Sequence, residues 1–278
     1  MAKRIFSTVL LWIGVFAVLW FFRTKGVVVV LALMSALTLR EFYRLQAGAG
    51  RVPFTKLGMA FGALITAAPY FEAQYGWPGH ILLPGAVLVF CLRILTERPP
   101  DQRVDALGAS VFGLVYVALL LSYLVRIATP HPADPVSADG RLLLCVWVVA
   151  VAKFCDTGAL LSGLAFGQTP MAPVTSPKKT WEGAVGGVAI SAGVGALIAW
   201  LSHSVLGDFL SPGRAALLAL PIACVAIVSD LIESMIKRQA ALKDSGKAIP
   251  GIGGIFDLTD SLLLAAPLGY ILLGLHSP

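Results

Sequence analysis

Long apolar stretches recur along this chain, and they limit its fold more than any other feature. Several windows of about 16 to 22 mostly apolar residues are each long enough to form a transmembrane helix. Only 13% of the residues are charged and 58% are hydrophobic. A water-soluble domain of 278 residues does not have this composition. The sequence therefore predicts an all-α, polytopic integral membrane protein.

The apolar pattern predicts nine transmembrane helices, the first of which starts with basic residues. Its apolar run is too long for the core of a signal peptide and has no small-residue cleavage site, so it is expected to remain in the protein. The predicted helices lie at residues 5–22, 26–39, 57–72, 80–96, 106–126, 142–162, 183–205, 214–236 and 261–275. They are expected to form a single membrane domain, 1–278, with an N-terminal helical scaffold at 1–130 and a catalytic helical half at 140–275.

Lysine and arginine are unevenly divided between alternate loops of this arrangement. With the N-terminus in the cytoplasm, fifteen of the 21 basic residues lie in cytoplasmic segments, five lie on the other side and Lys153 lies within a span. Because cytoplasmic loops carry an excess of these residues, we expect a cytoplasmic N-terminus and a C-terminus on the far side. The net charge of +6 is expected to attract membrane lipids and phosphates, and no nucleic acid is expected.

Acidic residues gather in the C-terminal half of the chain. A carboxylate in a span is costly unless it is paired, so such residues indicate a functional site by default. Seven of the fifteen carboxylates lie in or near the last four predicted spans, on the side assigned as cytoplasmic: Asp156, Glu182, Asp230, Glu233, Asp244, Asp257 and Asp260. The functional site is therefore predicted in this half.

Two segments of this half place charges beside a helix. In "KFCDTG", Lys153 and Asp156 lie three residues apart on one helix face, where they can pair. A purely structural ion pair remains the alternative there. In "SPKKTWEG", Lys178 and Lys179 follow Ser176 and precede Thr180, a predicted helix N-cap. Cations and hydroxyls at a helix N-terminus favour phosphate binding, and a solvated basic loop is the alternative.

The helix that follows carries small residues at a spacing of four. This pattern predicts a packing seam that lets two helices approach closely, without chemistry of its own. The small residues are Gly183, Gly187, Ser191 and Gly195.

The segment "SDLIESMIKR" places acidic and basic residues on one face of a helix. Asp230, Glu233 and Lys237 are spaced by three and four residues. An amphipathic helix end leaving the membrane would explain Lys237. It does not explain Asp230, which follows a long apolar run and needs a cation.

The segment "PGIGGIFDLTDS" brings glycines and two aspartates to the start of the last apolar stretch. The turn containing Gly253 and Gly254 frees backbone N–H groups and lets an anion approach closely. Helix capping could explain Asp260 alone. Together, Asp230, Asp257 and Asp260 are predicted to form an oxygen-only cluster of the kind that binds Mg²⁺, which also binds substrate phosphates.

These motifs resemble the phosphatidate cytidylyltransferase family. The resemblance rests on "SPKKTWEG", on "DTGALLSGLAFG" and on the pattern SxxKRxxxxKDxGxxxPGxGGxxDxxDS, and covers roughly residues 150–262. It implies a multi-pass enzyme of the bacterial inner membrane. Such an enzyme joins CTP to phosphatidic acid, giving CDP-diacylglycerol and pyrophosphate, with Mg²⁺ and a second cation such as K⁺. A homodimer is an open alternative to a monomer.

The resemblance and the residue patterns together define the candidate site. The catalytic candidates are Asp230, Lys237, Asp244, Asp257 and Asp260, of which Asp230, Asp257 and Asp260 are also candidate metal ligands. The candidates for phosphate binding are Ser176, Lys178, Lys179, Thr180, Arg238, Lys243, Gly253 and Gly254. Two further candidates are Asp156 and Glu233.

Two positions depart from the family pattern PGHGGxxDRxDS. Ile252 stands in place of the histidine and Leu258 in place of the arginine. An apolar side chain neither transfers a proton nor binds a phosphate. A relative that acts on another lipid phosphate, or that is not catalytic, therefore remains open. An ion-coupled transporter is a further alternative, although the polar motifs are confined to one half of the chain, where a transporter built from repeats would have them in both.

Overall fold

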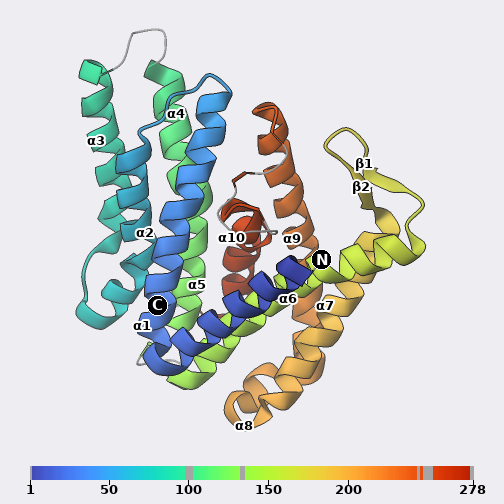
Figure 1. Ribbon diagram of the computed structural model, residues 1–278. Coiled ribbons are helices and arrows are strands. Elements are labelled where there is room, and N and C mark those ends of the chain that lie inside the picture. The colour runs from blue at the N-terminus through green and yellow to red at the C-terminus, as the bar shows by residue number, and fades with distance from the viewer. Residues whose placement is uncertain (1, 98–102, 132–134, 243–244, 247–252, 276–278) are drawn as a thin grey trace. The chain divides into compact units, whose positions relative to one another are not determined.

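The computed structural model describes residues 2–97, 103–131, 135–242, 245–246 and 253–275 (Figure 1). The described residues are mainly helical, which confirms the all-α class. The helices are α1 (Ala2–Gly48), α2 (Thr55–Tyr75), η1 (Gly79–Ile81), α3 (Leu82–Glu97), α4 (Arg103–Gly113), the π-helix η3 (Leu114–Leu119), α5 (Leu120–Ala128), α6 (Ala138–Phe166), α7 (Trp181–Leu201), α8 (His203–Leu206), η4 (Gly207–Leu210), α9 (Pro212–Gln239) and α10 (Phe256–Leu272). One antiparallel hairpin, β1 (Pro170–Ala172) and β2 (Ser176–Thr180), precedes α7.

The chain divides into two compact units. The first contains Met1–Arg126 and Ile236–Thr259, and the second contains Ile127–Met235 and Asp260–Pro278. The end of α9 and the start of α10 therefore belong to the unit that also contains α1 to α4.

Six helices of the described chain are long and apolar enough to cross a membrane, so the prediction of nine is not confirmed. They are Trp20–Gly48, Gly79–Thr96, Arg103–Ala128, Ala138–Phe166, Trp181–Leu201 and Pro212–Gln239. Of the remaining predicted spans, 57–72 falls in α2, which contains Lys56 and Glu72, and 261–275 overlaps α10, which has 17 residues. The protein is a multi-pass membrane protein, and six spans of full length are found among its described residues.

The first two predicted spans fall in a single helix, α1, which is interrupted by a kink. Arg23 has a φ of 48° and a ψ of −133° there, outside helical geometry. Figure 1 shows the change of direction between the dark blue start of α1 and its lighter remainder. The predicted loop between 22 and 26 is thus a kink at Arg23.

Tyr43 organises the core of the first unit. Its ring occupies the space that a Cβ at Gly58 of α2 or at Gly113 of α4 would take, and its hydroxyl donates to the carbonyl of Ser110 at 2.8 Å. The ring of the adjacent Phe42 lies edge-on to that of Phe256, with centroids 6.1 Å apart. Aromatic packing of this kind fixes the start of α10 against α1.

Helices α6 and α7 of the second unit pack along the predicted seam. A Cβ at Gly187 would lie 2.7 Å from the carbonyl oxygen of Cys155, so the two backbones approach closely because α7 has no side chain there. Ser191 donates to the carbonyl of Val151 at 2.6 Å, and the indole of Trp147 donates to the carbonyl of Gly195 at 3.0 Å. The structure confirms that the small-residue series forms a helix–helix contact.

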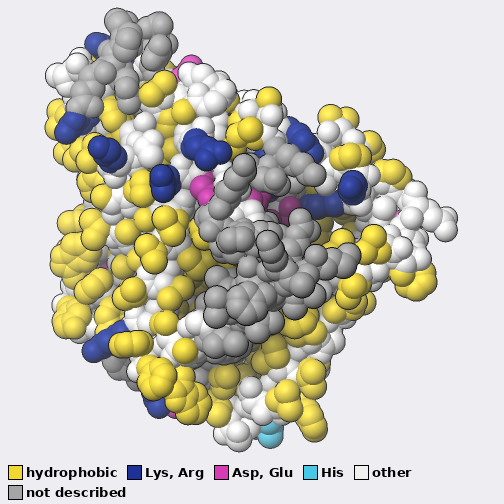
Figure 2. All heavy atoms as spheres, viewed as in Figure 1, with side chains coloured by type: hydrophobic (Ala, Val, Ile, Leu, Met, Phe, Trp, Pro, Cys, Tyr) yellow, Lys and Arg dark blue, Asp and Glu magenta, His cyan; other side chains and the backbone are white. Residues whose placement is uncertain are grey.

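Hydrophobic side chains cover much of the surface seen in Figure 2. On α3, for example, Leu88, Leu92 and Leu95 are 61%, 60% and 62% exposed. A water-soluble monomer rarely exposes large apolar patches of this kind. These faces suit contact with lipid.

Candidate functional site

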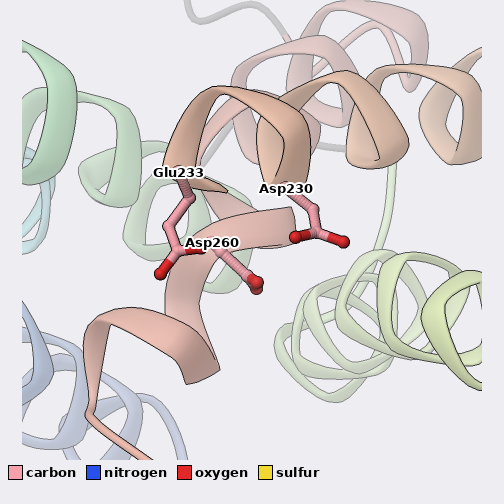
Figure 3. A group of neighbouring side chains, drawn as sticks. All are labelled: Asp230, Glu233 and Asp260. Carbon is pink, nitrogen blue, oxygen red and sulfur yellow. The ribbon is translucent and has the colours of Figure 1, made fainter. Parts of the chain in front are cut away.

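Three carboxylates of the second unit, Asp230, Glu233 and Asp260, form a group that we call the acidic cluster. One oxygen from each lies within 4.8 Å of the others. Figure 3 shows Asp230 and Glu233 extending from α9 and Asp260 from α10. Glu233 and Asp260 are buried, and Asp230 is half-buried.

Local sequence explains how the two helices present these side chains. Asp230 and Glu233 lie three residues apart on α9, so they share a helix face. The hydroxyl of Ser229 donates to the backbone carbonyl of Asp260, which ties α9 to α10 at this point. The Asp260 carboxylate accepts the backbone N–H of Ser261 at 2.6 Å. The position of Asp260 is therefore fixed by one hydrogen bond within α10 and by another from α9.

Lys153 connects the acidic cluster to α6. Its Nζ lies 3.4 Å from Oδ2 of Asp156 and 3.1 Å from Oδ1 of Asp260. The predicted pairing of Lys153 with Asp156 is confirmed. Because this lysine also contacts Asp260, it links Asp156 to the acidic cluster.

The hairpin β1–β2 brings one of its two adjacent lysines to the acidic cluster. Lys179 forms an ion pair with Asp230, whereas Lys178 is exposed. Successive side chains of a strand point to opposite faces, so the two lysines are separated by the strand geometry. Ser176, which begins β2, is half-buried.

The base of the hairpin is fixed to α7 by two capping interactions. Thr180 is the N-cap, as predicted, and accepts the backbone N–H of Gly183 at 3.2 Å. Glu182 accepts the backbone N–H groups of Gln168 and Thr169, each at 3.1 Å. These hydrogen bonds fix the position of β2, the strand that carries Lys179.

A second polar network, in the first unit, contains Asp257. Its Oδ1 pairs with Nζ of Lys237 at 2.8 Å, and its Oδ2 accepts the backbone N–H of Gly254 at 2.7 Å. Oδ2 also accepts the hydroxyl of Ser245 at 3.0 Å. Gly253 has a φ of +127°, a conformation that glycine adopts without strain. We call these residues, with Glu41, the Asp257 network.

The structure describes two further positions of the motif. Arg238 is exposed at the end of α9, and Leu258 is half-buried on α10. Lys243, Asp244 and Ile252 lie outside the described residues. The role of Asp257 as a metal ligand stays a prediction.

Sequence reasoning missed Glu41 and Ser245. Glu41 accepts the hydroxyl of Ser245 at 2.8 Å and the backbone N–H of Phe256 at 2.9 Å. A signal was present, because Glu41 is an acidic residue within the candidate span Trp20–Gly48. Its partners are more than 200 residues away in the chain, and only the fold identifies them.

The acidic cluster has the chemistry of a site for a hard divalent cation. All three candidate ligands supply carboxylate oxygens, the donors that Mg²⁺ prefers. Two lysines adjoin them and could contact an anion that accompanies the cation. The arrangement could hold a metal ion together with phosphate groups.

Comparison with known proteins places this arrangement in a family. The model of the cytidylyltransferase family matches residues 2–276. A phosphatidate cytidylyltransferase of Synechocystis is 32% identical, over 93% of this chain and 90% of that protein. The phosphatidate cytidylyltransferase of Brucella suis is 41% identical over 80% of this chain and 84% of that protein. That of Thermotoga maritima is 34% identical over 64% of this chain and 63% of that protein.

The match extends beyond the motif-bearing half of the chain, over the N-terminal helices as well. The chain therefore belongs to the cytidylyltransferase family.

Proposed function

We propose that this protein transfers the cytidylyl group of CTP to phosphatidate, forming CDP-diacylglycerol and pyrophosphate for phospholipid synthesis. The observation that carries the proposal is the acidic cluster with Lys153 and Lys179 beside it, in a multi-pass protein of this family. A phosphate-bearing lipid keeps its acyl chains in the bilayer, so an enzyme that acts on it needs polar groups among membrane helices. We place the protein in the bacterial inner membrane, with the site on the cytoplasmic side, where CTP is found.

The reaction is an in-line displacement at the α-phosphorus of CTP. A phosphate oxygen of the lipid forms the new bond to this phosphorus, and the bond to the β-phosphate oxygen breaks, releasing pyrophosphate. The attacking oxygen is already anionic near neutral pH, so no general base is required. This chemistry is compatible with Ile252 in place of the family histidine.

We assign Asp230, Glu233 and Asp260 as the ligands of Mg²⁺. When bound, this ion would supply positive charge to the attacking and leaving oxygens. Asp156 and Lys153 would support Asp260, because Lys153 contacts both carboxylates. A role for K⁺ stays a proposal that rests on the resemblance alone.

Lys179 is assigned to a phosphate of the substrates. In the structure it pairs with Asp230, so binding of a phosphate would exchange one anionic partner for another. Lys237 is assigned to a second phosphate, with Asp257 orienting it. Positioning and neutralisation of charge are the main contributions that a protein makes to such a transfer.

The direct test is an assay of the purified protein in detergent or nanodiscs. Labelled CTP, phosphatidic acid and Mg²⁺ should give a labelled CDP-lipid and pyrophosphate in equal amounts. Diacylglycerol, which lacks the phosphate, should give none. Turnover of another lipid phosphate but not of phosphatidate would redirect the proposal to that lipid. Failure with every lipid phosphate tested, by a folded protein, would support a non-catalytic relative.

A further inference from the structure

We propose that Glu41 is a positioning residue for Lys237 and Asp257, acting from α1 through Ser245 and the first turn of α10. The inference rests on the proposed function, which assigns Lys237 to a phosphate and Asp257 to its orientation. Glu41, Lys237, Ser245 and Asp257 all belong to the first unit.

Glu41 binds two segments that come from a distant part of the chain. Its Oε2 accepts the hydroxyl of Ser245 at 2.8 Å and the backbone N–H of Phe256 at 2.9 Å. Phe256 is the first residue of α10, and the first N–H groups of a helix have no acceptor within it. Glu41 therefore caps α10 from another helix. Its negative charge is also favourable at a helix N-terminus.

Two buried glycines provide the space that this carboxylate fills. A Cβ at Gly254 would collide with Oε2 of Glu41 and with the hydroxyl of Ser245. A Cβ at Gly246 would collide with Oε1 of Glu41. The backbone is thus fitted around both oxygens of Glu41, which restricts where Ser245 and α10 can lie.

Ser245 links Glu41 to the ion pair. Its hydroxyl lies 2.8 Å from the Glu41 carboxylate and 3.0 Å from Oδ2 of Asp257. A hydroxyl has one proton, so Ser245 donates to one of the two carboxylates at a time. Asp257 in turn pairs with Lys237 at 2.8 Å. If Ser245 and the start of α10 move, Asp257 moves with them, and so does the lysine that it orients.

The first test compares Glu41→Ala with Glu41→Gln. Loss of the carboxylate in Glu41→Ala should lower kcat by roughly ten- to a hundredfold and alter the KM for CTP much less, since a misplacement of about 1 Å costs this much. Glu41→Gln keeps an acceptor oxygen of the same reach and should retain most of the wild-type kcat. The matched control is Glu72→Ala, which removes a glutamate of the same unit that pairs with Arg126 at 3.2 Å. This control should leave kcat unchanged.

The second test asks whether Glu41 acts through Asp257. In the double variant Glu41→Ala with Asp257→Asn, kcat should be close to that of Asp257→Asn alone, because both changes disturb one network. Multiplied losses would mean that Glu41 acts independently, and would overturn the inference. If Glu41→Ala does not fold, Glu41→Asp, which is one methylene shorter, replaces it in both tests.

The third test does not depend on activity. Hydrogen exchange at the amides of Gly254 and Phe256 should speed up in Glu41→Ala and stay slow in Glu41→Gln and Glu72→Ala. Unchanged protection in Glu41→Ala, or a wild-type kcat in that variant, overturns the inference. A folded wild-type protein that makes no CDP-lipid would instead overturn the proposed function, while the exchange data would still decide whether Glu41 holds α10.

Discussion

Asp257 and Asp260 lie three residues apart on α10, but their surroundings differ. Asp257 accepts hydrogen bonds from the Ser245 hydroxyl and the Gly254 backbone and pairs with Lys237. Asp260 lies close to the carboxylates of Asp230 and Glu233. Both aspartates have a lysine partner, Lys237 for Asp257 and Lys153 for Asp260, but Asp260 also adds negative charge to an acidic group. Asp257 therefore finds its partners within the protein itself, whereas the acidic cluster favours a cation from outside.

The comparison teaches that two aspartates of one motif can have different tasks. In the Asp257 network the Asp257 carboxylate is paired with Lys237, so its contribution is to hold that lysine in place. In the acidic cluster, repulsion between carboxylates makes a bound cation favourable. Changing each aspartate to asparagine separates the two tasks, because asparagine keeps the shape and removes the charge.

Asp260→Asn is expected to have the largest effect on activity. Weakening a metal clamp worth several kcal/mol should lower the rate of CDP-lipid formation by roughly a hundredfold or more. Stability without metal should change little, because one repulsive charge is lost along with one contact to Lys153. The measurements are turnover and the rise in Tm that Mg²⁺ causes in detergent. This rise should be present in the wild type and absent in the variant. A normal rise in Tm would contradict the assignment of Asp260 as a ligand.

Lys179→Ala should have the next largest effect. Removing a charge-assisted contact to a phosphate is expected to cost about 1.5 to 3 kcal/mol, or roughly ten- to a hundredfold in kcat/KM for CTP. Lys178→Ala is the matched control, because Lys178 is adjacent in the same strand but exposed. It should change kcat/KM by a small factor. Equal losses of kcat/KM in the two variants would contradict the inference that Lys179 contacts a substrate phosphate and Lys178 does not.

Asp257→Asn should affect stability more than Asp260→Asn and activity less. The ion pair with Lys237 and the charge assistance to the Gly254 N–H are lost, which should cost about 1 to 3 kcal/mol of the free energy of unfolding. Asparagine can still accept one N–H, so α10 should still begin at the same residue. The measurements are denaturation midpoints in detergent and kcat. If Asp257→Asn instead abolished the Mg²⁺-dependent rise in Tm, Asp257 would be a metal ligand, as the motif alone predicts.

Hydropathy was sufficient to predict the fold class and the position of most helices. Six predicted spans correspond to helices long and apolar enough to cross a membrane. Hydropathy also located the break between the first two predicted spans, where two helical segments meet at the Arg23 kink, but it could not indicate that a kink and not a loop connects them. The predicted span 57–72 forms the helix α2, but its crossing of the membrane is not confirmed, because Lys56 and Glu72 lie near the two ends of this helix.

The candidate site was predictable only where its residues are close in the sequence or share a helix face. Helical spacing brought Asp230 together with Glu233, and Lys153 with Asp156. The difference between Lys178 and Lys179 was not predictable, because the sequence pattern does not indicate the strand β2 that this segment forms. Glu41 could not be connected to Ser245, because 204 residues separate them and nothing in the local pattern indicates the contact.

Ser245→Ala is the smallest change and the most specific to the Asp257 network. It removes one hydroxyl that faces two carboxylates, Glu41 and Asp257, at 2.8 and 3.0 Å. Loss of one buried hydrogen bond should cost about 1 kcal/mol of the free energy of unfolding, and kcat should fall only a few-fold.

Ser35→Ala is the matched control, because Ser35 is a buried serine of α1 whose hydroxyl donates to the carbonyl of Gly62 at 3.4 Å. The control should lose a similar or smaller amount of stability and keep the wild-type kcat. The effect of Mg²⁺ on Tm should be normal in both variants, since both serines belong to the first unit and the acidic cluster belongs to the second. If Ser245→Ala lowers kcat no more than Ser35→Ala does, the hydroxyl does not transmit the position of Glu41 to Asp257. Glu41 would then act on Asp257 through the capping of α10.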